Sequence, residues 1–152
     1  MFDPKVMPQQ ALDSVRAVRS NQGEMQMLLV APQVVIHDKP EKRTVYPKGV
    51  EMHIFDNNAK PTADIYAAYA CSYDEKKLII AKDSVVIIDF RTGDTSYLKS
   101  IEWNSATHRI SSNDPIKSVN GQRVTFGDGF ESDDNFNEPR ILRQRGTMTF
   151  DE

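Results

Sequence analysis

The chain has 152 residues, of which 39% are hydrophobic and 27% are charged, and its formal net charge is −3. A chain of this length fits one domain that buries roughly 68–70% of its unfolded surface. The slight acidity argues against a broad phosphate-binding surface, and therefore against nucleic acid as the main partner. No apolar run approaches the ~18–20 residues that span a bilayer. The single cysteine, Cys71, cannot form an internal disulfide, so cysteine usage leaves the compartment open.

Residues 1–22 are polar and include Pro4 and Pro8. Within them, residues 11–18 would make only about two helical turns, which are marginal in water without tertiary support. We therefore expect residues 1–22 to be a short N-terminal tail or a weakly docked helix. Residues 23–152 are expected to form the folded domain.

From Glu24 onward, apolar and polar residues alternate with a period close to two, which is typical of β-strands. The expected strands are residues 24–30, 34–36, 44–46, 50–55, 62–73, 78–81, 84–90, 95–103, 108–111, 116–119, 124–130 and 140–150. Residues 62–73 are rich in alanine, so a helix competes there, but the turn and return strand that follow favour a hairpin. Asn120-Gly121 is typical of a type I′ hairpin turn. The pattern predicts a single all-β unit of antiparallel strands.

The stretch from Gly121 to Asp134 ends in Gly127-Asp128-Gly129-Phe130 and an acidic turn. No helix pattern follows it and no lysine completes a phosphate-binding motif. The glycines therefore predict a strand that bends, bulges or lets another backbone come close. In the acidic turn, Asp133, Asn135 and Asn137 have calcium-loop spacing, but the turn glycine and the terminal glutamate of such a loop are missing. A solvated surface turn is the expected structure.

Few side chains suggest catalysis or metal binding. His37, His53 and His108 lie on or beside different expected strands and lack metal-ligand spacing. Cys71 falls on the apolar side of its expected strand, so we interpret it as a small buried hydrophobe. The chain has no nucleophile-elbow motif, and no carboxylate pair is marked out for glycoside hydrolysis. The sequence predicts a binding protein without a metal or cofactor, and not an enzyme.

Two surfaces are candidates for binding. The first is an apolar stripe, which is ordinarily core but would line a groove if a folded-over sheet splayed open. Its members are Met27, Leu29, Ile54, Ile65, Tyr69, Ile79, Val85, Ile87, Leu98, Ile101, Trp103, Ile110, Val124 and Phe130. The second is a basic cluster of Arg140, Arg143 and Arg145 on the last expected strand. It either discourages edge aggregation or contacts anionic headgroups or an acidic partner.

Several motifs occur together in a fixed order. They are Tyr46-Pro47-Lys48-Gly49-Val50, Ala67-Ala68-Tyr69-Ala70 with Tyr73, Ser84-Val85-Val86-Ile87, Leu98 with Trp103-Asn104, and Gly127-Asp128-Gly129-Phe130-Glu131-Ser132-Asp133. Over about residues 23–150 the chain resembles the LptC family of periplasmic lipopolysaccharide-export proteins, in the form found in Bacteroides-like bacteria. Ala68 stands where an aspartate is common and Ser84 where an asparagine is common. Neither position is expected to have a chemical role.

This resemblance implies a twisted, boat-shaped, OstA-like β-jellyroll whose interior holds acyl chains, so the apolar stripe would line a lipid-binding groove. It also implies a periplasmic location and an inner-membrane anchor, a helix or a lipid, ahead of residue 1. The strand at residues 24–30 would face the inner-membrane ABC transporter, and residues 140–150 would face an LptA-like bridge protein. Gly127, Gly129 and the three arginines would form the partner edge, with Gly127 sensitive to bulky replacement. Open sheet edges also allow a homodimer.

The expected function is therefore that of a carrier that passes lipopolysaccharide from the transporter to the bridge protein. Each buried CH₂ contributes ~0.8 kcal/mol, so a chain of about a dozen carbons would lose ~10 kcal/mol if it were exposed to water. A dry β groove removes that barrier without a catalytic residue. Two alternatives stay open: a non-enzymatic carbohydrate- or protein-binding β-sandwich, and a small β-barrel hydrolase.

Overall fold

The computed structural model describes residues 10–21 and 23–149, which contain fourteen antiparallel β-strands joined in one sheet and no helix. The strands are β1 (Gln10–Asn21), β2 (Glu24–His37), β3 (Arg43–Tyr46), β4 (Val50–Phe55), β5 (Pro61–Ala67), β6 (Tyr69–Tyr73), β7 (Leu78–Asp89), β8 (Thr95–Asn104), β9 (Arg109–Ser112), β10 (Ile116–Asn120), β11 (Arg123–Gly127), β12 (Phe130–Asp133), β13 (Arg140–Ile141) and β14 (Gly146–Thr149). This architecture is β-jellyroll-like and confirms the predicted fold class. In the described part of the chain, no helix has the length and apolarity needed to cross a bilayer.

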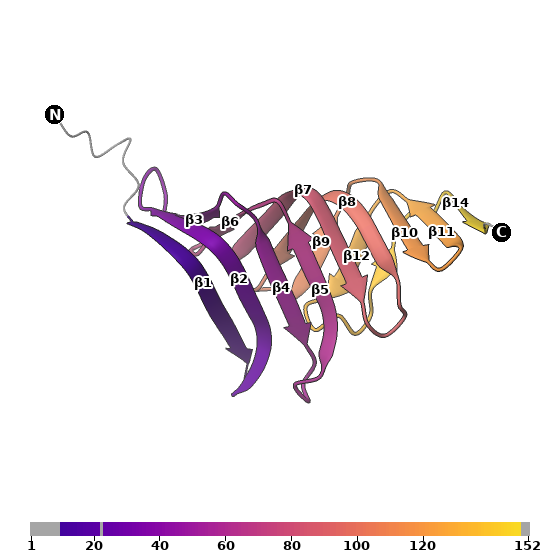
Figure 1. The fold of residues 1–152 in the computed structure, drawn as a ribbon, viewed down its shortest axis with the longest axis horizontal. Helices are drawn as coiled ribbons and strands as arrows, with labels where there is room; N and C mark the ends of the chain where they lie inside the picture. The colour runs from indigo at the N-terminus through magenta and orange to yellow at the C-terminus, as the bar shows by residue number, and fades with distance from the viewer. Residues whose placement is uncertain (1–9, 22, 150–152) are drawn as a thin grey trace.

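The sheet folds over into two layers because three long strands each contribute to both (Figure 1). One half of β2 pairs with β4 and the other with β3. Likewise, β7 pairs with β5 and β6, and β8 pairs with β10 and β9. We call the layer of β4, β5, β10, β11 and β14 the front layer, and that of β3, β6, β9, β12 and β13 the back layer. Strands β1 and β14 lie at opposite ends of the molecule.

The long strands bend along one side of the molecule, which we call the crease. Pro32 lies at the bend of β2, where it cannot donate a ladder hydrogen bond. In β7 the register shifts between Lys82 and Val85, and Asp83 and Ser84 both have φ of 63°. Bulges of this kind bend a strand and re-aim the residues that follow it. The crease therefore comes from local backbone features.

Gly49 allows the turn between β3 and β4 to fit at the crease. Its φ is 98°, in the left-handed region, and a Cβ at this position would lie 2.9 Å from the Ala67 carbonyl oxygen. Only glycine tolerates both the conformation and the close approach. The turn that passes the chain from the back layer to the front layer thus depends on a missing side chain.

The N-terminal prediction is wrong for Gln10–Asn21, which form β1 and pair with β2 along almost its whole length. This strand has little alternation because most of its side chains are exposed, so a pattern-based reading of the sequence misses it. Its structure comes from the ladder that the long neighbouring strand offers. Residues 1–9 and 22 of the predicted tail lie outside the described residues.

The C-terminal strands form as the glycines predicted, but in shorter pieces. Residues 124–130 divide into β11 and β12, and residues 140–150 contain β13 and β14. Gly127, at the end of β11, lies against the backbone that follows β13. A Cβ at Gly127 would lie 2.8 Å from the Leu142 carbonyl oxygen and closer still to the Ile141 side chain. The prediction of close backbone approach at Gly127 is confirmed.

Replacing Gly127 by alanine is expected to destabilise the fold by about 1–3 kcal/mol, because the added methyl group overpacks the contact with Leu142. Urea unfolding with an unchanged m-value would measure the loss. The matched control is Gly146→Ala, since a Cβ at Gly146 meets nothing within 4 Å. Its effect should stay within about 0.5 kcal/mol. Equal midpoints for the two variants would contradict the close-packing account.

Candidate functional site

The candidate site is the interior between the two layers. Most of the predicted groove residues lie in this single core, which alternating side chains of facing strands build. They are Met27, Leu29, Ile54, Ile65, Ile79, Val85, Ile87, Leu98, Ile101, Trp103, Ile110 and Phe130. The structure therefore brings twelve of the fourteen predicted residues together.

Tyr69 and Val124 lie outside this core cluster. Ala68 interrupts the strand between β5 and β6, so Ala70 faces the core and Tyr69 faces outward, with the Lys82 ammonium 5.0 Å from its ring. Val124 is itself buried, but it pairs with Val119 and the half-exposed Met148 outside that cluster. The placement of these two residues in the groove is wrong.

The centre of the interior is filled by the protein's own side chains. A largely enclosed pocket of about 10 Å³, which we call the sealed pocket, remains there, enough for about one water molecule. Its walls come from both layers: Met27, Met52, Ile54, Ile65, Ile101, Trp103, Ile110 and Asp134. The Arg19 guanidinium lies 4.9 Å from the Trp103 ring centroid and covers it from β1.

Towards the C-terminal end, the layers enclose a larger cavity of about 260 Å³, which we call the mouth cavity. Ile87, Asp89 and Ser96 line it from the front, and Phe130 and Ile141 from the back. The Ser96 and Ser118 hydroxyls bond to each other at 3.1 Å within it. The mouth cavity therefore combines apolar and hydroxyl-bearing walls.

The loop of residues 133–139, between β12 and β13, closes the side of the molecule opposite the crease. We call it the strap. Its Asn135 amide oxygen accepts a hydrogen bond from Gln26 Nε2 at 3.2 Å, and its carbonyl accepts one from Thr62 Oγ1 at 2.9 Å. Both partners belong to the front layer, whereas the strap starts from the back layer.

Asp134 and Phe136 of the strap point inward, so the expected solvated turn is wrong for these two residues. The Asp134 carboxylate accepts from Trp103 Nε1 at 3.3 Å and lies 2.9 Å from His108 Nδ1. Phe136 is 1% exposed and stacks on Phe130 with ring centroids 5.7 Å apart. Asp133, at the calcium-like position, accepts the Asn137 and Glu138 amides. Its carboxylate therefore shapes the turn.

The predicted partner edge is occupied by internal contacts. Arg140 pairs with Glu131, and Arg145 Nε lies 3.0 Å from the Asp128 carboxylate. The Arg143 guanidinium donates to the Asp128 carbonyl oxygen, and a Cβ on Gly129 would press against the same guanidinium at 2.7 Å. The arginines thus tie the C-terminal strands together, whatever else they contact.

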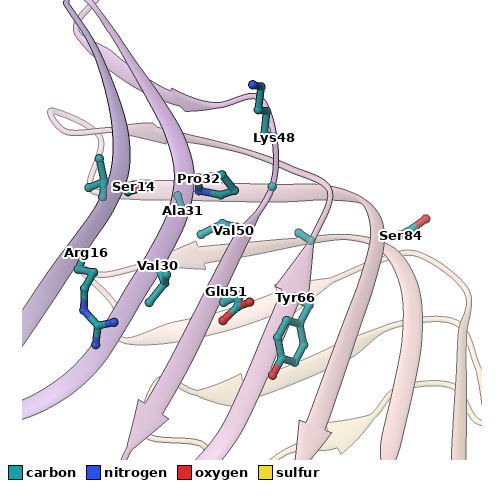
Figure 2. A pocket seen from close by; sticks show the side chains of 13 residues that line it. Ser14, Arg16, Val30, Ala31, Pro32, Lys48, Val50, Glu51, Tyr66 and Ser84 are labelled. Atoms are coloured by element: carbon teal, nitrogen blue, oxygen red, sulfur yellow. The ribbon is translucent and has the colours of Figure 1, made fainter.

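A cleft of about 530 Å³ lies beside the crease, and its lining includes the core residues Ala31, Val50 and Ala67 (Figure 2). Arg16, Val30, Glu51 and Tyr66 lie side by side on its wall, on successive strands. Desolvation and the neighbouring Asp64 carboxylate raise the pKa of the Tyr66 phenol. The cleft is polar at its rim, and no periodic pattern of residues predicts it.

The residues singled out for chemistry are dispersed. Within residues 10–21 and 23–149, no three histidine, cysteine or acidic side chains gather at a metal-binding spacing. His53 Nδ1 lies 2.6 Å from Asp64 on the outer face, while His108 is held by the strap. Cys71 is buried but lies outside the core cluster. The placement of Cys71 agrees with its interpretation as a small buried hydrophobe.

No model of a known protein family matches the chain, and no curated protein matches it.

Hydrogen bonding from Arg140, and the charges of Arg140 and Arg109, hold the pKa of Glu131 below its usual range. A lowered folded-state pKa stabilises the protein above the unfolded value of about 4.3, and the stabilisation disappears as pH falls through the folded pKa. Glu131→Gln should therefore lower the melting temperature at pH 7, and the gap from wild type should close below about pH 4.

The control is Glu75→Gln in the exposed turn between β6 and β7, where no salt bridge involving Glu75 is found among the described residues. This variant should melt like wild type at both pH values. A gap for Glu131→Gln that persisted unchanged at low pH would contradict an ionic contribution.

Proposed function

We propose that this protein is a non-enzymatic lipid carrier of the LptC type, which passes lipopolysaccharide between an inner-membrane ABC transporter and a periplasmic bridge protein. The observation that carries the proposal is a folded-over sheet with a continuous apolar interior and, among the described strands, end strands that pair on one side only. Such an interior shields acyl chains from water, and such edges can pair with strands of neighbouring proteins. Neither task requires a catalytic residue.

The N-terminal end supports the proposal because the lining continues beyond the buried core. Val15 and Ala17 of β1 pair with Ala31 and Leu29, which are buried core residues. Residues directly opposite in an antiparallel pair share a face. The apolar lining therefore reaches the outermost strand, where a partner's strand would extend it. β1 takes the transporter-facing position that the resemblance implied for residues 24–30.

At the C-terminal end, β13 and β14 each pair with one neighbour among the described strands. The mouth cavity opens between the layers at this end. Its hydroxyl pair and carboxylates suit the polar groups of an amphiphile, while its aromatic wall suits a hydrocarbon chain. This end is the position that we propose for the bridge protein.

The second candidate function is a carbohydrate- or protein-binding module, and the outer cleft favours it. That cleft is larger than the mouth cavity and presents Arg16, Lys48, Glu51 and Tyr66. The two functions therefore differ in whether the ligand contacts the interior between the layers or the cleft beside the crease.

Photo-crosslinking separates these functions. Benzoylphenylalanine at Phe130, or at Trp103, should form an adduct with lipopolysaccharide, because both side chains lie inside. The same group at Phe90, which is 49% exposed, should form none. Mass spectrometry of the protein after illumination measures the adduct. Adducts only at an outer residue of the cleft, such as Tyr66, would replace the carrier proposal by the binding-module alternative.

A further inference from the structure

We infer that the strap is the gate of an internal binding site for a single acyl chain, and that Phe136 occupies the place of that chain in the closed state. This inference deepens the proposed function and rests on it for the class of ligand. It concerns which part of the protein moves, and which wall of the interior the chain passes.

The strap contributes to the walls of both interior spaces. Phe136 and Pro139 line the mouth cavity on one side. Asp134 lines the sealed pocket on the other side, together with Trp103. Moving the strap away would join the two spaces and open them to the side opposite the crease.

Apart from the apolar packing of Phe136, the links that hold the strap to the front layer among the described residues are a few exchangeable hydrogen bonds. They comprise the Gln26 and Thr62 hydrogen bonds and a third between Asn135 Nδ2 and Asn57 Oδ1 at 3.2 Å. Each uses a side chain on at least one partner, and no strand pairing joins the strap to the front layer. Water can replace each of these bonds when the strap lifts. On the crease side, by contrast, continuous strands join the layers.

Phe136 has the features of a displaceable plug. It is almost fully buried, yet its φ is 59°, a region that bulky residues rarely adopt. Strained backbone of this kind persists where the surroundings hold it, and it is concentrated in clamps and switches. Its ring packs on Phe130, as a hydrocarbon chain would. Displacing the ring would release the strained backbone and free an apolar slot.

The chemistry beyond Phe136 selects a hydrocarbon chain. The sealed pocket has one ionisable side chain in its wall, Asp134, and that carboxylate is bound by Trp103 and His108. Met27 and Met52 both line it, and methionine side chains repack readily around irregular shapes. A sugar would leave its hydroxyls unpaired against these walls.

Cross-linking the strap tests the inference. Asn57→Cys and Asn135→Cys in a Cys71→Ala background would be joined by a short, reducible bis-methanethiosulfonate. Trp103 is the only tryptophan in the chain, so its fluorescence reports on the pocket. The ligand probe is ω-bromododecanoic acid, because bromine quenches tryptophan on contact. The matched control joins Glu41→Cys to Lys76→Cys, whose native side chains pair within the back layer.

We expect the brominated acid to quench Trp103 fluorescence in the reduced strap variant. When the cross-link forms, this quenching should weaken at least about tenfold, and reductant should restore it. The control cross-link should change nothing. Equal quenching with the strap linked and released would overturn the gate. Phe136→Ala gives a second test, since emptying the slot should strengthen binding several-fold. Unchanged or weaker binding in a folded Phe136→Ala protein would overturn the plug.

The results also separate this inference from the proposed function. Lipopolysaccharide adducts at Phe130 without any quenching of Trp103, even in Phe136→Ala, would place the chain elsewhere and overturn the inference alone. Strap-dependent quenching without lipopolysaccharide adducts would support an acyl-chain site and remove the lipopolysaccharide carrier. Absence of both signals would overturn both.

Discussion

The bend of three long strands between two layers is the constraint on which the rest of this structure depends. Because β2, β7 and β8 cross from one layer to the other, each layer is covalently continuous with its partner along the crease. The same bend turns one face of every strand inward, which gathers the apolar side chains into a single core. Pro32 and the Asp83–Ser84 bulge fix where the bend falls, so short backbone irregularities determine the shape of the whole interior.

A sheet folded along one side leaves the other side to be closed by different means. Here side-chain hydrogen bonds close that side, because the strap contacts the front layer through amide groups and a hydroxyl. The contrast matters mechanically: strands that continue through a crease resist separation, while isolated hydrogen bonds exchange with water. Segments with the fewest cooperative contacts are the ones that open locally at the lowest free-energy cost. The strap side is therefore the compliant side of the molecule, and it borders directly on Trp103 and Phe130.

Much of the fold was predictable because strands such as β4 and β8 alternate cleanly and end at recognisable turns. β1 was missed because neither of its faces is well buried, so period and composition carry no signal there. Tyr69 was misplaced because the interruption at Ala68 reverses the side chains that follow, and nothing in the local sequence marks it. Val124 is apolar and buried, so composition does not distinguish it from the core cluster. The strap was unpredictable for another reason: Gln26 and Asn135 are 109 positions apart, and only the folded chain brings them together.

β1 pairs with both halves of β2, from Met27 in the front-layer half to Ile36 in the half that joins the back layer. A protein that adds a strand to β1 would therefore follow the curvature of both layers at once. If cargo spreads the layers, that curvature changes, and the docked partner binds a different shape. Binding free energies at linked sites are reciprocal. If a partner prefers the spread shape, its binding would raise the affinity for cargo, and cargo would raise the affinity for the partner by the same factor. The exposed edge of β1 would then respond to whether the interior holds cargo.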